Sequence, residues 1–152
     1  MDGKWKINSN KSGLLSSITE IILSGKVPKF IINSIKHRVN SLDILLFITD
    51  LKNRSITQKR FQKKIVNPTD INVFIDNGED NVIRCGIKFY SRYNIDFKNY
   101  VIKISTFIPS KNLNLIMIKR FNGNEMTEEI SLYKNKDSLI KKIIRKFDKI
   151  KN

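Results

Sequence analysis

Two alternating apolar runs on either side of an Asn-Gly pair limit the fold of this chain more than any other feature. The runs are Ile71–Asp76 and Val82–Tyr90, and Asn77-Gly78 lies between them. Alternation of apolar and polar residues is typical of strands with one buried face, and Asn-Gly tolerates the positive φ of a tight turn. The pattern therefore predicts a β-hairpin, whose core face is formed by Val73, Ile75, Ile83, Cys85 and Ile87.

Other segments extend the predicted sheet on both sides of this hairpin. Strands are expected at Ser41–Ser55, Tyr100–Ser110 and Leu113–Phe121, and a short helix is expected within Ser12–Gly25. Residues 136–151 show the clearest helical pattern, because large apolar residues recur there at helical spacing among lysines. That apolar stripe consists of Leu139, Ile140, Ile143, Ile144, Phe147 and Ile150.

The order of these elements predicts the fold class. Residues 1–11 are polar and are expected to form a flexible N-terminus, and Val27–Ile32 reads as an extended lead-in because Pro28 disfavours a helix. Residues 12–152 then form a single domain in the order helix, five strands, helix. This order matches a mainly β, five-stranded Greek-key barrel of the oligonucleotide-binding (OB) fold, with a short N-terminal helix and an amphipathic C-terminal helix.

The charge of the chain points to a polyanionic partner. There are 29 Lys and Arg residues against 14 Asp and Glu, so the formal net charge is +15. A natural protein with such a surplus usually meets nucleic acid, and less often an anionic membrane or an acidic partner. Composition alone is the alternative explanation, because Asn, Lys and Ile dominate the chain, as they do in proteins from AT-rich genomes.

Several classes of function are disfavoured by what the sequence lacks. One cysteine and one histidine exclude an internal disulfide and the usual zinc sites, so no metal or other cofactor is expected. There is no glycine-rich phosphate loop, and Asp76 is interpreted as a turn-capping residue, so no enzyme is expected. The N-terminus lacks the apolar core of a signal peptide, and no apolar run approaches the roughly 20 residues of a membrane span. A soluble, intracellular protein without membrane association is therefore expected.

Two longer stretches resemble a known family. "FIDNGEDNVIRCGIKF" resembles the signature of the second and third strands in the Stn subunit of the telomeric CST complex, and is similar to a looser form in the middle subunit of replication protein A. "NYVIKISTFIPSKNLNLIMIKRF" resembles the fourth and fifth strands of the same family. The resemblance covers about residues 14–150. It departs from the family at Lys88, where tryptophan is frequent, and at Lys98-Asn99, where Gly-Asp is usual.

The resemblance implies an OB-fold subunit of a replication-protein-A-like CST complex, located in the nucleus at telomeres. Such a subunit would bridge a small Ten-like OB-fold subunit and a large OB-fold subunit. The complex would bind single-stranded, G-rich telomeric DNA and support C-strand synthesis with DNA polymerase α–primase, in some systems with telomerase. The first alternative is a general single-stranded DNA-binding protein, either a replication protein A middle subunit or a stand-alone protein. The second is an interaction module whose positive charge meets an acidic partner.

Candidate DNA-binding residues combine aromatic rings, on which bases stack, with cations that follow the phosphates. Phe74, Arg84 and Lys88 lie on the predicted outward face of the hairpin. The alternative is that Phe74 is covered by neighbouring chain and that the cations are only solvated. A basic run after the first strand and two later positions complete the set: Lys59, Arg60, Phe61, Lys63, Lys64, Phe107 and Lys111.

The apolar stripe of the predicted C-terminal helix has two interpretations. It could seal the open end of its own barrel, or it could pack against a helix of a partner. Six large apolar residues exceed what a small barrel needs, and the resemblance implies contact with the small subunit. The predicted partner-binding residues are therefore Leu139, Ile140, Ile143, Ile144, Phe147 and Ile150.

Overall fold

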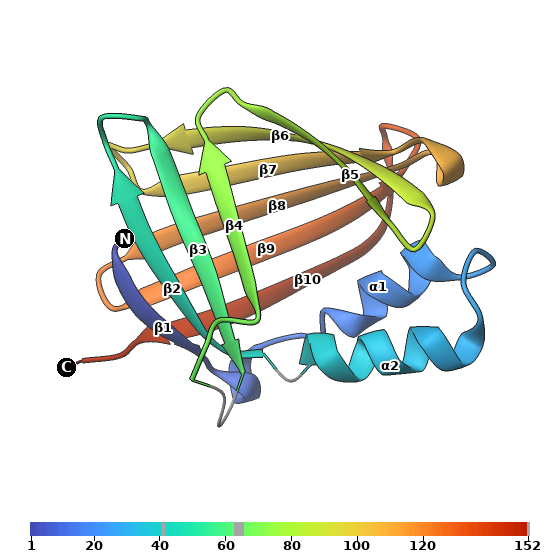
Figure 1. Ribbon diagram of the computed structural model, residues 1–152, viewed down its shortest axis with the longest axis horizontal. Coiled ribbons are helices and arrows are strands. Elements are labelled where there is room, and N and C mark those ends of the chain that lie inside the picture. Colours follow the sequence, from blue (N-terminus) through green and yellow to red (C-terminus); the bar gives the residue numbers. More distant parts are fainter. Residues whose placement is uncertain (41, 63–65, 152) are drawn as a thin grey trace.

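Ten antiparallel strands surround one interior in the computed structural model, which describes residues 1–40, 42–62 and 66–151 (Figure 1). In the described residues, a short 3₁₀ helix (Ser9–Lys11) and two α-helices lie between the first and second strands along the chain. The elements are β1 (Gly3–Ile7), α1 (Ser16–Leu23), α2 (Lys29–Asn40), β2 (Leu42–Asp50), β3 (Ser55–Gln62), β4 (Asp70–Ile75), β5 (Glu79–Arg84), β6 (Ile87–Asp96), β7 (Val101–Ile108), β8 (Leu113–Asn122), β9 (Glu125–Lys134) and β10 (Ser138–Lys149).

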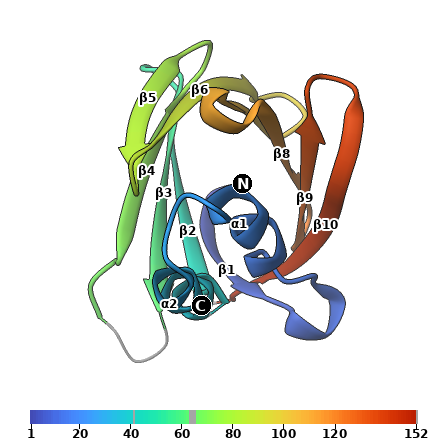
Figure 2. The same cartoon turned by 90° about the vertical axis from the view of Figure 1, so that its right-hand side faces the viewer.

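The strands form a nearly closed barrel. Their order in the sheet is β4-β3-β2-β1-β10-β9-β8-β7-β6-β5, so β4 and β5 are its two edges and form no ladder with each other. Both helices lie at one end of the barrel, and the chain termini lie toward the other end (Figures 1 and 2). The predicted five-stranded Greek-key OB barrel is therefore wrong: the sheet has twice as many strands, and from β6 to β10 they follow one another as neighbours.

The central hairpin is displaced from its predicted position. Asn77 has a positive φ of 60°, but the turn around it carries the chain from β4 to β5 without pairing the two strands. The tight turn lies instead at Cys85-Gly86, where φ is 53° and 73°, and joins β5 to β6. Positive φ at both central residues matches the twist of a two-residue hairpin. An Asn-Gly pair favours a turn, but it does not decide whether the flanking strands pair.

The two faces of this region are also opposite to the prediction. Phe74 is buried at 6% exposure, whereas Val73 and Ile75 are 51% and 53% exposed. On β5, Ile83 is 67% exposed and Cys85 beyond it is exposed as well, so of the five predicted core residues only Ile87 is buried. Alternation shows that a strand has two unlike faces, but here both faces of β4 carry apolar residues, and the larger Phe74 fills the interior.

The predicted C-terminal helix is strand β10, and β9 precedes it in a segment where no strand was predicted. Between β9 and β10 the register aligns Ile143 with Ile130 and Phe147 with Met126. All four of these side chains are buried, so they alternate along the strands with residues on the outer face. The apolar spacing in β10 looked helical because a charged residue, Arg145, lies inside the barrel between the two buried positions.

Two apolar clusters fill the two ends of the barrel. Residues 1–11 were expected to be flexible, but they include β1, which pairs with β2 and β10 and buries Trp5 completely. The rings of Trp5 and Phe47 lie edge-on to Phe121, with centroids 5.3 and 5.1 Å away. The second cluster lies beneath the helices and includes Ile18 and Ile22 of α1, which is the predicted N-terminal helix. It also includes Ile32, Ile108, Ile130, Leu132 and Ile143.

Helix α2 replaces the predicted extended lead-in. Pro28 immediately precedes its first residue, and the carbonyl of Pro28 accepts hydrogen bonds from the amides of Ile31 and Ile32. Proline lacks an amide hydrogen, but the first turn of a helix does not need one, so proline is favoured at helix starts. The residue that argued against a helix therefore lies immediately before one.

Candidate functional site

Two adjoining cavities lie between the apolar clusters. The portal cavity has a volume of about 830 Å³ and lies between α1, α2, β3, β4 and the Cys85 turn. The inner cavity has a volume of about 320 Å³ and lies deeper among the strands. Arg60, Asn72, Arg84 and Phe89 line both, so the cavities meet at these four side chains.

The walls of the cavities are mixed in character. Apolar side chains contribute most of the inner surface, from strands on opposite sides of the barrel. Phe74 of β4 contacts Tyr93 of β6, with ring centroids 5.3 Å apart. The apolar lining of the inner cavity includes Leu45, Phe74, Val82, Phe89, Ile104, Leu115 and Met117.

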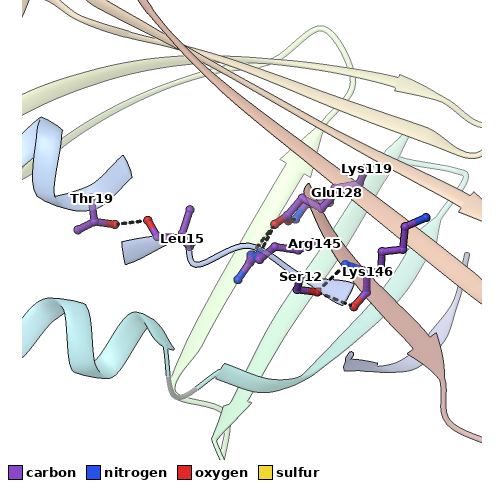
Figure 3. A network of polar contacts seen from close by, with 7 residues as sticks. All are labelled: Ser12, Leu15, Thr19, Lys119, Glu128, Arg145 and Lys146. Atoms are coloured by element: carbon purple, nitrogen blue, oxygen red, sulfur yellow. Dashed lines mark hydrogen bonds and ion pairs between the residues drawn. The ribbon is translucent and has the colours of Figure 1, made fainter. Parts of the chain in front are cut away.

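A buried ion-pair network crosses β8, β9 and β10 at the inner cavity (Figure 3). The network consists of Lys119, Glu128 and Arg145, whose positions are aligned by the strand register. The ammonium of Lys119 and the guanidinium of Arg145 both donate to the Glu128 carboxylate, the latter through Nε at 2.6 Å. All three residues are at most 5% exposed. One carboxylate therefore serves two cations inside the barrel.

Burial and the neighbouring charges act in opposite directions on the pKa values of Glu128 and Lys119. Burial alone would raise the pKa of Glu128, but the charges and hydrogen bonds of Arg145 and Lys119 outweigh it and lower that pKa from 4.5 to about 2. Burial lowers the pKa of Lys119, although Glu128 acts in the opposite direction. The two shifts agree with the geometry, because a single carboxylate offsets only part of the cost of burying two cations.

We expect this network to make the protein sensitive to acid. The lowered pKa of Glu128 means that its contribution to stability is complete above about pH 4.5 and is lost as the pH falls toward 2. Urea unfolding measured across this range for the wild type and for Glu128→Gln would isolate the contribution of this carboxylate. The difference in unfolding free energy between the two proteins should shrink as the pH falls. A difference that stays constant would contradict the assignment.

A second polar group of residues lies on β3 and β4. Gln58 and Arg60 point inward from β3, and Asp70 and Asn72 lie opposite them on β4. Arg60 Nη1 lies 3.6 Å from Asp70 Oδ2. Burial lowers the pKa of Arg60, and the nearby Asp70 charge opposes this shift. The mouth of the inner cavity is therefore polar, between two apolar regions.

Positive charge exceeds negative charge among the residues that line the two cavities. Five cationic side chains face three carboxylates, which leaves a surplus of two positive charges. An interior of this kind favours an anionic group on whatever molecule enters it. The cations are Arg38, Arg60, Arg84, Lys119 and Arg145, and the carboxylates are Asp70, Asp80 and Glu128.

The predicted DNA-binding residues do not form one surface. Three of them line the interior cavities: Phe74, Arg60 and Arg84. Lys88 is instead exposed on the outer side of β6, where its strand partner is the exposed Ile83 of β5. The remaining residues have other positions. Lys59, Phe61 and Phe107 are half-buried, and they alternate with the inward residues of their strands. Lys111 donates from Nζ to the carbonyls of Ile21 and Ser24 at the end of α1. Lys63 and Lys64 lie outside the described residues.

The predicted partner-binding stripe is also divided. Ile143 and Phe147 are buried in their own barrel, and Ile150 is half-buried. Leu139, Ile140 and Ile144 are exposed, but they do not join the buried residues in one face. The prediction of a helix that binds a small subunit is therefore wrong.

Sequence reasoning missed most of the polar residues that line the inner cavity. The sequence of β8–β10 did contain a usable signal. Each member of the ion-pair network has an apolar residue two positions before it and another two positions after it. A charged residue within an apolar alternation indicates a charged side chain inside the barrel when the residue aligned with it on the neighbouring strand has the opposite charge. The missed residues include Gln58, Asn72, Lys119, Glu128 and Arg145.

Two kinds of site are not found in the described part of the chain. No group of three or more His, Cys, Asp or Glu residues there could hold a metal ion. Neither described α-helix has the length and apolar character required to cross a membrane.

Comparison with known protein families and with curated protein sequences finds no match. Solved structures do match. Secretory abundant heat soluble protein 4 from Ramazzottius varieornatus has a TM-score of 0.66 at 13% identity, covering 98% of this chain and 94% of that chain. The fatty-acid-binding protein from Manduca sexta has a TM-score of 0.65 at 11% identity, covering 97% and 98%. The wild-type fluorescent protein UnaG has a TM-score of 0.63 at 14% identity, covering 99% and 97%.

These matches correct the functional prediction as well as the fold. None of these three neighbours is an OB-fold subunit, and nothing in the barrel supports a CST subunit at telomeres, a general single-stranded DNA-binding protein or the associated partners. At such low identities, the likeness shows a shared fold alone. The chain is thus similar in fold to the ten-stranded barrels of fatty-acid-binding and secretory abundant heat soluble proteins.

Proposed function

We propose that this protein binds a small, largely apolar molecule that carries an anionic group, and that it holds this molecule inside the barrel. The observation that carries the proposal is the pair of adjoining cavities, which lead from the helices to the interior. Their volumes of about 830 and 320 Å³ are of the size that encloses small ligands. Apolar walls with a few placed charges are typical of such sites.

The charge of the interior supports the anionic part of the proposal. The residues that line the two cavities carry two more positive than negative charges, and the half-buried Arg60 lies where the cavities meet. An anion is stabilised more strongly there than at the protein surface, because the local dielectric constant is lower. One neighbour in fold is a fatty-acid-binding protein, which makes a fatty acid or a similar amphipathic acid the first ligand class to test.

Direct titration tests this proposal. Cys85 is the only cysteine, is exposed and lines the portal cavity, so an environment-sensitive dye attached to it would report ligand entry. We expect myristate to change the dye fluorescence saturably, with one molecule bound per chain. Calorimetry on the unlabelled protein would confirm the stoichiometry.

Thermal unfolding provides an independent measurement. A ligand present at 100 times its Kd stabilises the native state by about 2.7 kcal/mol, so the melting temperature should rise clearly with myristate. A G-rich single-stranded oligonucleotide serves as the control and should neither displace myristate nor change the dye signal. Unchanged fluorescence and an unchanged melting temperature with every amphipathic acid would contradict the proposal.

A further inference from the structure

Strand β3 holds two buried polar atoms that have no partner among the described residues. They are Nε of Arg60, a donor, and Oε1 of Gln58, an acceptor. Both side chains line the inner cavity, and Gln58 is only 7% exposed. An unmet buried donor or acceptor is costly, so a ligand group that meets it gains affinity and one that cannot is rejected.

The existing ion pair of Arg60 does not supply a hydrogen-bond acceptor for its Nε. Its distance to Asp70 is 3.6 Å through Nη1, and the Asp70 side chain is 49% exposed. Such a long, partly solvated pair contributes little and leaves Nε unused. Arg84 lines the same two cavities and makes no hydrogen bond or ion pair with any described residue, so it adds positive charge at this point.

The other interior cations are already paired. Lys119 and Arg145 both contact Glu128, which is fully buried and carries a pKa of about 2. Both cations of this network already donate to Glu128, whereas Nε of Arg60 has no partner among the described residues. The unused donor for an anion therefore lies on β3.

We propose that Arg60 and Gln58 select for apolar acids that also carry a hydroxyl group; this inference rests on the proposed function. An oxygen of the acid accepts from Arg60 Nε–H, and the hydroxyl donates to Gln58 Oε1. The two residues are two positions apart on one face of a strand, so their Cα atoms are about 7 Å apart. The acid and the hydroxyl must therefore lie near each other on the ligand, with the apolar remainder against Phe74, Phe89 and Met117.

Calorimetric titration with three matched compounds tests this selection: myristic acid, its methyl ester and β-hydroxymyristic acid. For the wild type we expect the hydroxy acid to bind most tightly and the ester least tightly. Arg60→Met should weaken binding of the acids roughly tenfold or more and binding of the ester much less, because the uncharged ester carbonyl accepts a weaker hydrogen bond than a carboxylate does. Gln58→Leu should weaken binding of the hydroxy acid about threefold to tenfold without affecting myristic acid.

Lys59→Met is the matched control, because Lys59 lies between these two residues on β3 but on the outer side of the sheet, opposite the exposed Ile71. It should change none of the three affinities. Circular dichroism checks the fold of each variant. Arg60→Lys keeps the charge but lacks Nε–H, and it should weaken binding of the acids about threefold to tenfold, so it tests the same contact if Arg60→Met does not fold.

The outcomes separate this inference from the proposed function. Retained acid affinity in Arg60→Met, or equal wild-type affinity for myristic and β-hydroxymyristic acid, overturns the selection by β3 but leaves ligand binding intact. Absence of binding by all three compounds overturns the proposed function, and the selection with it.

Discussion

Replacing Glu128 with glutamine is expected to lower the free energy of unfolding at neutral pH by about 3–5 kcal/mol, since removal of one partner from a buried ion pair leaves an uncompensated charge. Here the loss affects two cations, because both Lys119 and Arg145 depend on this carboxylate. Glutamine has nearly the same shape and still accepts a hydrogen bond, so the effect reports the charge. Urea unfolding followed by circular dichroism measures the change.

Glu129→Gln is the matched control for this experiment. Glu129 is the next residue on β9, and it also pairs with two cations, Arg120 and Lys142, but on the solvent-facing side of the strand. Exposed pairs of this kind contribute about 0–1 kcal/mol each, so a small change is expected. Similar losses in Glu128→Gln and Glu129→Gln would contradict the conclusion that the Glu128 network is internal.

Two of the three residues of this network explain why the last two strands were not predicted. An apolar alternation is recognised most easily when every inward position is apolar. In β9 and β10 the inward positions include Glu128 and Arg145, which interrupt the alternation at one level of the barrel. What remained of the apolar pattern in β10 had helical spacing. Strand β8 was predicted at Leu113–Phe121, although Lys119 interrupts its alternation in the same way.

The prediction of the central hairpin was wrong for a different reason. The position of β4 was predicted nearly correctly, because local alternation is a short-range signal. The predicted strand Val82–Tyr90 instead spans the end of β5, the Cys85-Gly86 turn and the start of β6. Pairing and the choice of inward face depend on contacts with β3 and β6, which no local pattern contains. Phe74 was assigned to the outer face because Val73 and Ile75 outnumber it, whereas the interior accommodates the one aromatic ring.

The candidate site was accessible only in part from the sequence. Arg60, Arg84 and Phe74 were chosen because cations beside aromatic rings suit a polyanion. The structure brings these three residues together around the inner cavity, where Phe74 is buried and Arg84 is exposed. Their common location depends on barrel closure. Gln58 carries no sequence signal of its own, because a polar residue in a strand normally faces solvent.

Phe147→Ala is expected to lower the free energy of unfolding by about 3–5 kcal/mol, the usual cost of truncating a fully buried phenylalanine. Phe147 is 0% exposed, and its strand neighbours are Ile7 of β1 and Met126 of β9. The guanidinium of Arg145 also lies over its ring, 5.4 Å from the centroid. Removing the ring therefore opens a cavity where the first and last strands join. Thermal and urea unfolding measure the loss.

Ile144→Ala distinguishes the strand from the helix that the sequence suggested. Residues three apart share one face of a helix but lie on opposite faces of a strand. Ile144 is 44% exposed, so its truncation in the barrel should change stability by only about 0.5 kcal/mol. A helix packed through both residues would lose similar amounts from the two substitutions. A large loss for Phe147→Ala beside a small one for Ile144→Ala is therefore a result that only the strand explains.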